Sequence, residues 1–145
     1  KWLFSTRFKH AQQVRIDIVV EPAAALVAAD AGLLERVIAN LAANALNYAP
    51  ASTRVSIGAS ASAGRVLVRV VDTGPGVPAA ERDRLFEPFQ RLGDVPRGEG
   101  VGLGLAVARG LTEAMGGTLS AEDTPGGGLT FVVDLPLHGL DGDAA

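Results

Sequence analysis

The stretch that most constrains the fold is GLLERVIANLAANALNY, residues 32–48. Its apolar residues recur at spacings of three and four, which is typical of a helix that packs one face against a core. These residues are Leu33, Leu34, Val37, Ile38, Leu41 and Ala45. Asp30 precedes the stretch as an N-cap, and Pro50 follows it as a stop. The sequence therefore predicts an amphipathic helix over Gly32–Tyr48 that organises the domain.

Asn40, Asn44 and Asn47 lie on one narrow stripe of this helix, at the edge of its apolar face. A buried carboxamide without a partner costs about 1–3 kcal/mol, so these side chains need partners. One interpretation is a polar flank that bonds to neighbouring backbone. The other is a site for a hard divalent cation or for phosphate-bound water, which carboxamide oxygens suit.

Composition narrows the class of protein. The 145 residues are 48% hydrophobic and 20% charged, which is typical of one soluble globular domain. No signal peptide or membrane-length apolar stretch is present, so we expect no direct membrane contact. The absence of cysteine excludes disulfides and thiolate metal sites and is compatible with the cytoplasm. A net charge of −3 without a basic stripe argues against nucleic acid as a partner.

Hydrophobic periodicity predicts the other elements. The expected strands are Val14–Val20, Leu26–Ala28, Ser52–Ser60, Arg65–Val71, Thr118–Glu122 and Leu129–Leu135, the expected second helix is Gly102–Met115, and a helical turn is expected at Ala79–Leu85. This order predicts an α+β sandwich, with a mixed, mostly antiparallel sheet of about five strands covered on one face by about three helices. We expect the domain to span residues 14–137, with residues 1–13 as an extension or the end of a preceding helical domain and residues 138–145 as a flexible tail.

Asp72 follows the strand Arg65–Val71 in phase with its alternate valines, so its carboxylate should point to the core side of the sheet. Such a carboxylate either caps the next loop in an Asx turn or accepts a hydrogen bond from a ligand amine at the floor of a pocket. Gly74 and Gly76 follow, and they allow the backbone to approach a flat ligand closely.

A second glycine cluster, GEGVGLGLAVA, opens the helix predicted at Gly102–Met115. Amides at a helix N-terminus can hold phosphate, although a glycine-rich loop can also be merely flexible. Leu105 and Val107 occupy the positions where a dinucleotide-binding fingerprint needs its last glycine, and no Gly-Lys-Ser/Thr occurs. Phosphate bound here would therefore need another geometry.

The segment RLFEPFQR lies between the two glycine clusters. Phe86 and Phe89 either pack a loop against the core or form the hinge of a movable lid. Arg91 follows them as a cation suited to a terminal phosphate. His10 and His138 are isolated and match no nucleophile or metal pattern, so we expect both on the surface.

Four stretches in this order, ERVIANLAANALNYAP, VVDTGPGVP, LFEPFQR and GEGVGLGLAVA, resemble the N, G1, F and G2 boxes of the ATP-binding catalytic domain of bacterial sensor histidine kinases. The wider superfamily includes gyrase, Hsp90 and MutL and has the Bergerat ATP-binding fold. The resemblance covers about Val14 to Pro136. The stretch GVGLGLAVARGLTEAMGGTL is similar to sensor kinases of the Kdp potassium-uptake type.

The resemblance implies ATP and Mg²⁺ as ligands and a role for each matching residue. Asn44 resembles the Mg²⁺ ligand, and Asn40 the second asparagine beside the phosphates. Tyr48 resembles the residue that packs on adenine. Asp72 resembles the acceptor of the adenine amino group, with Gly74 and Gly76 lining the base pocket.

The remaining implied roles concern the phosphates and one water. Gly100, Val101, Gly102, Leu103 and Gly104 resemble the phosphate-binding loop, and Arg91 the lid arginine near the γ-phosphate. Thr130 resembles a polar residue that helps to hold a water at adenine. Asn47 stands where the family usually has lysine or arginine, so we expect weaker nucleotide binding, with Arg97 as a further cation.

The hydrolysing members of the superfamily carry a glutamate base at the position of Asn40, which cannot take a proton from water. A site without that base suits transfer of the γ-phosphoryl group to another nucleophile. In the histidine kinases this is a histidine on a separate dimerisation domain, from which a response regulator receives the phosphate. His10 does not match that motif, because Ala11 and Gln12 follow it.

We therefore expect a histidine kinase catalytic domain, with Asn40 and Arg91 at the reacting phosphate, in the cytoplasmic part of a membrane-anchored sensor. Two alternatives stay open. One is an anti-sigma-type serine kinase of the same superfamily. The other is a degenerate module that binds nucleotide and signals without chemistry.

Overall fold

The sheet is one of the two layers of the structure. A computed structural model describes residues 15–20, 31–48, 54–87 and 104–136. Five strands lie in the order β1-β2-β3-β5-β4. Their bounds are Arg15–Val20 (β1), Arg54–Ser62 (β2), Arg65–Asp72 (β3), Thr118–Asp123 (β4) and Leu129–Pro136 (β5). Because β1 pairs with β2 in parallel and all other pairs are antiparallel, the expected mixed, mostly antiparallel sheet is confirmed.

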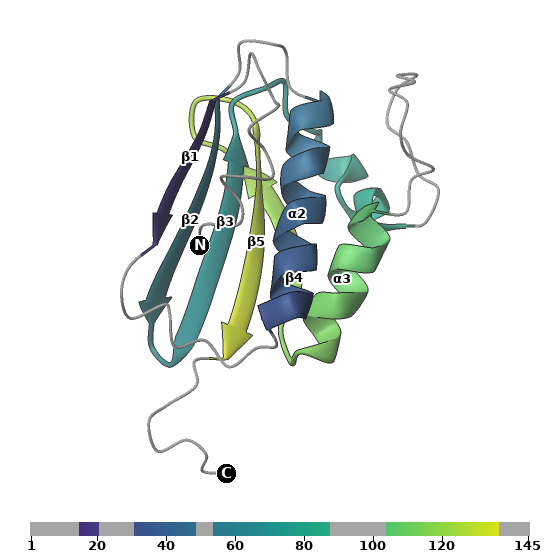
Figure 1. The fold of residues 1–145 in the computed structure, drawn as a ribbon. Helices are drawn as coiled ribbons and strands as arrows, with labels where there is room; N and C mark the ends of the chain where they lie inside the picture. Colours follow the sequence, from purple (N-terminus) through teal and green to yellow (C-terminus); the bar gives the residue numbers. More distant parts are fainter. Residues whose placement is uncertain (1–14, 21–30, 49–53, 88–103, 137–145) are drawn as a thin grey trace.

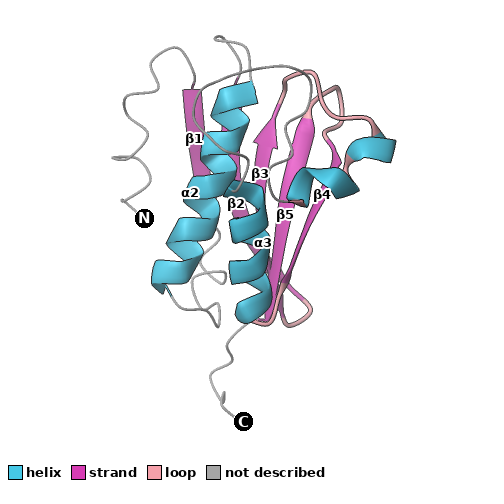
Figure 2. Ribbon diagram, turned by 90° about the vertical axis from the view of Figure 1, so that its right-hand side faces the viewer, coloured by secondary structure: helices cyan, strands magenta, loops and turns pink. Residues whose placement is uncertain are grey.

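The helices cover one face of this sheet (Figures 1 and 2). The two α-helices, α2 (Ala31–Tyr48) and α3 (Gly104–Ala114), lie side by side. Two short 3-10 helices, η2 (Ala79–Glu81) and η3 (Asp83–Phe86), form the helical turn expected in that region, and η3 contacts α3. The α+β sandwich is therefore confirmed. Among the helices described here, none combines the length and the apolar character of a membrane-spanning segment.

The core lies between the sheet and α2 and α3. Four residues of the predicted stripe of α2 are buried in the core, namely Val37, Ile38, Leu41 and Ala45. Leu34 packs against the core at half-burial, and Leu33 is half-buried outside it. Alternate residues of β3 face the helices, because successive side chains of a strand point to opposite sides. The largest fully buried side chains are Phe131, Leu41, Leu135, Val37, Val55, Val66, Val70, Val133 and Thr112.

Residues with positive φ, most of them glycines, form the turns. Ala63 and Gly64 both have positive φ (53° and 77°), which suits a two-residue hairpin turn and lets β2 continue to Ser62. The helix α3 ends at Ala114, one residue before the expected end, where Gly116 adopts a φ of 86°. A Cβ at Gly117 would lie 2.3 Å from the Asp134 carbonyl oxygen, so the second glycine is needed for this close approach.

Some expected features lie outside the described residues. These are the strand Leu26–Ala28, the N-cap Asp30, the stop at Pro50, the start of the second helix at Gly102, the extension 1–13 and the tail 138–145.

Candidate functional site

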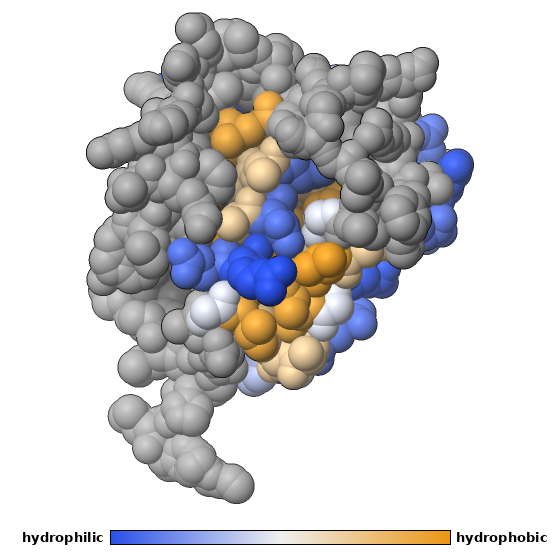
Figure 3. Space-filling view, turned by 45° about the vertical axis from the view of Figure 1, so that its right-hand side comes forward, coloured by the Kyte–Doolittle hydropathy of each residue, from blue (hydrophilic) through white to orange (hydrophobic). Residues whose placement is uncertain are grey.

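Four elements meet at one end of the sandwich, where the directions of the ribbons show that α2 and β3 end and that α3 and β5 begin (Figure 1). Strand pairing places the end of β3 beside the start of β5, because the two strands are antiparallel. The first backbone amides of α3, which have no acceptor within the helix, bring partial positive charge to this end. Hydrophilic side chains form a band between apolar patches on the face that carries the helices (Figure 3). This end of the fold therefore holds the candidate site.

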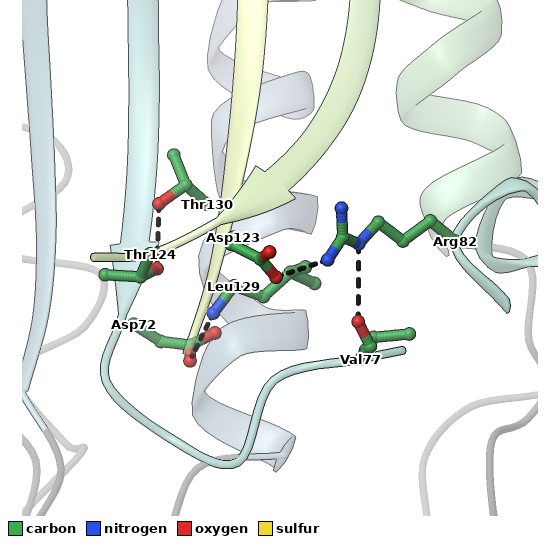
Figure 4. A network of polar contacts seen from close by, with 7 residues as sticks. All are labelled: Asp72, Val77, Arg82, Asp123, Thr124, Leu129 and Thr130. Carbon is green, nitrogen blue, oxygen red and sulfur yellow. Dashed lines mark hydrogen bonds and ion pairs between the residues drawn. The ribbon is translucent and has the colours of Figure 1, made fainter. Parts of the chain in front are cut away.

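Asp72 is the last residue of β3 and is buried, as its phase with the valines predicts. Its Oδ1 accepts a hydrogen bond from the backbone N–H of Gly74 at 2.9 Å. The same oxygen accepts a second one from the N–H of Leu129 at 3.2 Å (Figure 4). The hydrogen bond to Gly74 forms an Asx turn, which is the first of the two roles expected for Asp72. Among the described residues, none donates a hydrogen bond to Oδ2.

The loop after Asp72 packs backbone against backbone on the turn between β4 and β5. Gly76 has a φ of 79°, and a Cβ there would lie 3.2 Å from the carbonyl oxygen of Gly128. A Cβ on Gly128 would lie 2.0 Å from the carbonyl oxygen of Asp72. The close approach expected at Gly76 is therefore made, in this structure, to the chain's own turn.

Asn40 and Asn44 are half-buried, one turn apart on α2, at the edge of its buried stripe. Neither carboxamide hydrogen-bonds to another described residue, so the expected polar flank bonded to neighbouring backbone is not seen there. The described residues also contain no group of three or more His, Cys, Asp or Glu that could hold a metal. Among the described residues of this stretch of α2, Asn40 and Asn44 offer amide oxygens, which suit a hard cation.

Asn47 and Tyr48 belong to the last turn of α2, but their side chains lie outside the described structure. Gly104 begins α3, and a Cβ there would meet no atom within 4 Å. Arg91 and Arg97 lie outside the described residues, as do Gly100, Val101, Gly102 and Leu103.

Phe86 packs into the core, which confirms the packing interpretation for this residue. Its ring lies edge-to-face with that of Phe131, with centroids 6.1 Å apart. The guanidinium of Arg109 on α3 lies 4.9 Å from the Phe86 ring centroid. Phe89 and the expected lid lie outside the described residues.

Thr130 does not lie where its expected role requires. It pairs with Val71, whereas Val70 pairs with Phe131 of the core. Because side chains alternate along a strand, Thr130 points to the face opposite that of Asp72. Its hydroxyl lies 2.9 Å from that of Thr124. The residue of β5 that shares the face of Asp72 is Leu129, whose side chain is part of the core.

Two further residues of this end, Arg82 and Asp123, were not singled out in the sequence. Arg82 donates from Nε to the carbonyl oxygen of Val77 at 3.3 Å and forms an ion pair with Asp123 (Figure 4). The pair spans 41 residues of sequence, and no local pattern signals it.

Comparison with known proteins decides the family. The family described as "Histidine kinase-, DNA gyrase B-, and HSP90-like ATPase" matches residues 29–139, which is more than half of the chain. The chain belongs to this family. The resemblance of the four sequence boxes is thereby confirmed.

Within the ATPase family, the chain is homologous to sensor histidine kinases. It is 58% identical over 118 residues to the sensor protein KdpD of Mycobacterium tuberculosis, and this covers 81% of the chain and 14% of that relative. A mycobacterial sensor histidine kinase, MprB, superposes with a TM-score of 0.81 at 26% identity, over 92% of this chain and 90% of that one. Full-length ShkA in complex with AMPPNP has a TM-score of 0.77 at 33% identity, over 92% of this chain and 28% of that one.

Proposed function

We propose that this chain binds Mg·ATP and donates the γ-phosphoryl group to a histidine on a separate dimerisation domain of the same kinase, from which a response regulator receives it. The observation that carries the proposal is that the two oxygens of the Asp72 carboxylate differ in their hydrogen bonds. Oδ1 is occupied by two backbone N–H groups, which orients Oδ2 as a hydrogen-bond acceptor. An acceptor held in this way suits the exocyclic amine of adenine. That the structurally similar ShkA is in complex with AMPPNP, an adenine nucleotide analogue, supports the proposal that this chain binds an adenine nucleotide.

The phosphate end of the ligand would lie toward α2 and α3. By family resemblance we assign Asn44 as the Mg²⁺ ligand and Asn40 as its neighbour at the phosphates. Both side chains are half-buried on α2, and neither hydrogen-bonds to another described residue. Bound Mg²⁺ would offset phosphate charge. The start of α3 at Gly104 supplies backbone amides. By family resemblance we add Gly100, Val101, Gly102, Leu103 and Arg91 at the phosphates, and Tyr48, Gly74 and Gly76 at the base.

Asn40 favours transfer over hydrolysis. A carboxamide cannot accept the proton of an attacking water, so the site lacks a base at this position. In the proposed reaction a nitrogen of the acceptor imidazole bonds to the γ-phosphorus, the bond from that phosphorus to the bridging oxygen breaks, and ADP leaves. The imidazole then releases its N–H proton to solvent.

We further propose that residues 14–137 form the catalytic domain, and that the full protein is a membrane-anchored sensor whose kinase part lies in the cytoplasm. The chain spans only 14% of the length of its relative from Mycobacterium tuberculosis, so the acceptor histidine and the sensing segments would belong to other parts of the protein.

Thermal unfolding with and without Mg·ATP tests the binding site. At 100-fold over the Kd, a ligand stabilises the folded state by about 2.7 kcal/mol, which raises the Tm by several degrees. We expect a magnesium-dependent shift in the native chain that Asn44→Ala abolishes. Arg36→Ala, an exposed change on the same helix, should keep the shift. A native chain without a shift at millimolar nucleotide would contradict the proposal.

Phosphotransfer tests the reaction itself. Radiolabelled ATP is incubated with the chain and either a histidine-bearing dimerisation domain or a serine-bearing protein partner. Acid-labile label on the histidine domain is the expected result. Label on serine would favour the anti-sigma-type kinase. Binding without any transfer would favour the degenerate nucleotide-binding module.

A further inference from the structure

The loop from Thr73 to Pro78 is attached to the rest of the fold at both ends. At its start, Asp72 Oδ1 binds the N–H of Gly74 and, across to β5, the N–H of Leu129. At its other end, Arg82 binds the carbonyl oxygen of Val77 and the carboxylate of Asp123 at the end of β4 (Figure 4). The loop is thereby held against both β5 and β4.

The Arg82 side chain is suited to this second attachment. It is 20% exposed, whereas that of Asp123 is 77% exposed. Arg82 lies between η2 and η3, and its guanidinium offers several N–H donors in a fixed plane. Nε and a terminal nitrogen can therefore bind Val77 and Asp123 at the same time. A single exposed ion pair contributes little stability, so its effect should be local to the loop.

We infer that Arg82 is a positioning residue for the adenine pocket, acting through Asp123 and the backbone of Val77. This inference rests on the proposed function, in which Gly74 and Gly76 line the pocket. Arg82 lies outside the four sequence boxes from which the site roles come. Loss of either charged partner releases the end of the loop that Asp72 does not hold. The pocket wall then has to be ordered when the ligand binds, which lowers affinity.

A simple charge effect makes a different prediction. Arg82 is a cation and Asp123 an anion, so their removal should change the affinity for an anionic nucleotide in opposite directions. The positioning role requires both removals to weaken binding. It also requires the double variant to bind no worse than either single variant, because the two residues form one attachment.

The test measures the Kd of Mg·ADP and of adenosine by calorimetry on the full chain, for Arg82→Ala, Asp123→Ala and the double variant. Arg84→Ala is the matched control, because it removes an exposed arginine of η3 whose side chain forms no hydrogen bond or ion pair with another described residue. We expect both single variants and the double variant to weaken both ligands by about three- to tenfold. Arg84→Ala should change the Kd less than about twofold. Tighter ADP binding in Asp123→Ala, or multiplied losses in the double variant, would overturn the inference.

Hydrogen exchange separates this inference from the proposed function. Without ligand, the amides of Thr73, Gly74, Gly76 and Val77 should exchange faster in Arg82→Ala and Asp123→Ala than in the native chain or Arg84→Ala. If exchange is unchanged in both variants, Arg82 and Asp123 do not hold the loop, and this result does not depend on which ligand the chain binds. If the native chain binds neither ADP nor adenosine, the proposed function fails together with the pocket role. Normal ADP binding in the variants overturns only the role of Arg82.

Discussion

Asp72 and Leu129 lie 57 residues apart in sequence, and the Oδ1 atom of Asp72 accepts the backbone N–H of Leu129 at 3.2 Å. The same oxygen accepts the N–H of Gly74, so one carboxylate oxygen joins the end of β3, the following loop and the start of β5. The structural role and the proposed ligand role of Asp72 therefore fall on different oxygens, and substitutions can separate them.

Asp72→Ala should lower the free energy of unfolding by about 1–3 kcal/mol, because the buried N–H of Leu129 loses its acceptor. Asp72→Asn keeps a carbonyl oxygen that can occupy the Oδ1 position, so its loss should be clearly smaller. Urea unfolding of both variants measures the difference, with Asp83→Ala as a control at an exposed carboxylate of η3. Equal losses of unfolding free energy for the alanine and asparagine variants would contradict the structural role assigned to Oδ1.

Asp72→Asn should weaken ATP binding by about 10- to 100-fold, because an amide NH₂ would replace the acceptor of the adenine amine. The same NH₂ can donate to the carbonyl oxygen of hypoxanthine. Binding of ITP should therefore fall less than that of ATP, or improve. Calorimetry with both nucleotides measures the ratio. A parallel loss for ATP and ITP would place the base away from Asp72.

Gly104→Ala should leave stability intact, because a Cβ there meets nothing within 4 Å. If phosphate approaches the first amides of α3, the same methyl group should weaken Mg·ATP binding by about tenfold, which corresponds to an overpacking cost of about 1.4 kcal/mol. Gly110→Ala is the control, because its Cβ also meets nothing and it lies further along α3. If Gly104→Ala binds Mg·ATP with the same affinity as the native chain and Gly110→Ala, the ligand does not reach the start of α3.

Asn47→Lys should tighten Mg·ATP binding by about two- to fivefold at low salt, because the substitution would supply the cation that the family resemblance implies at this position. The gain should shrink as ionic strength rises. Asn47→Gln keeps a neutral amide and should bind like the native chain. Calorimetry at two salt concentrations checks both points, and an unchanged affinity for the lysine variant would contradict the expected role of position 47.

The local features of this fold could be predicted because they depend on spacing within one element. The helical periodicity of α2 predicted which of its residues are buried, and it predicted that Asn40 and Asn44 lie at the edge of the buried face. The period of β3 set the burial of Asp72. The pair Gly116-Gly117 predicted the end of α3, because a helix end needs a residue that tolerates positive φ.

Features that join separate elements could not be predicted in this way. The face of Thr130 depends on how β5 pairs with β3, since a shift of one residue reverses every side chain. The contact of Arg82 with Asp123 depends on a strand order that places β4 outside β5. The sequence alone determined the elements, the buried phase of Asp72 and the family resemblance. Strand pairing across long sequence separations decided which side chains share a face and which backbone groups Asp72 and Arg82 hold, because no spacing within one element carries that information.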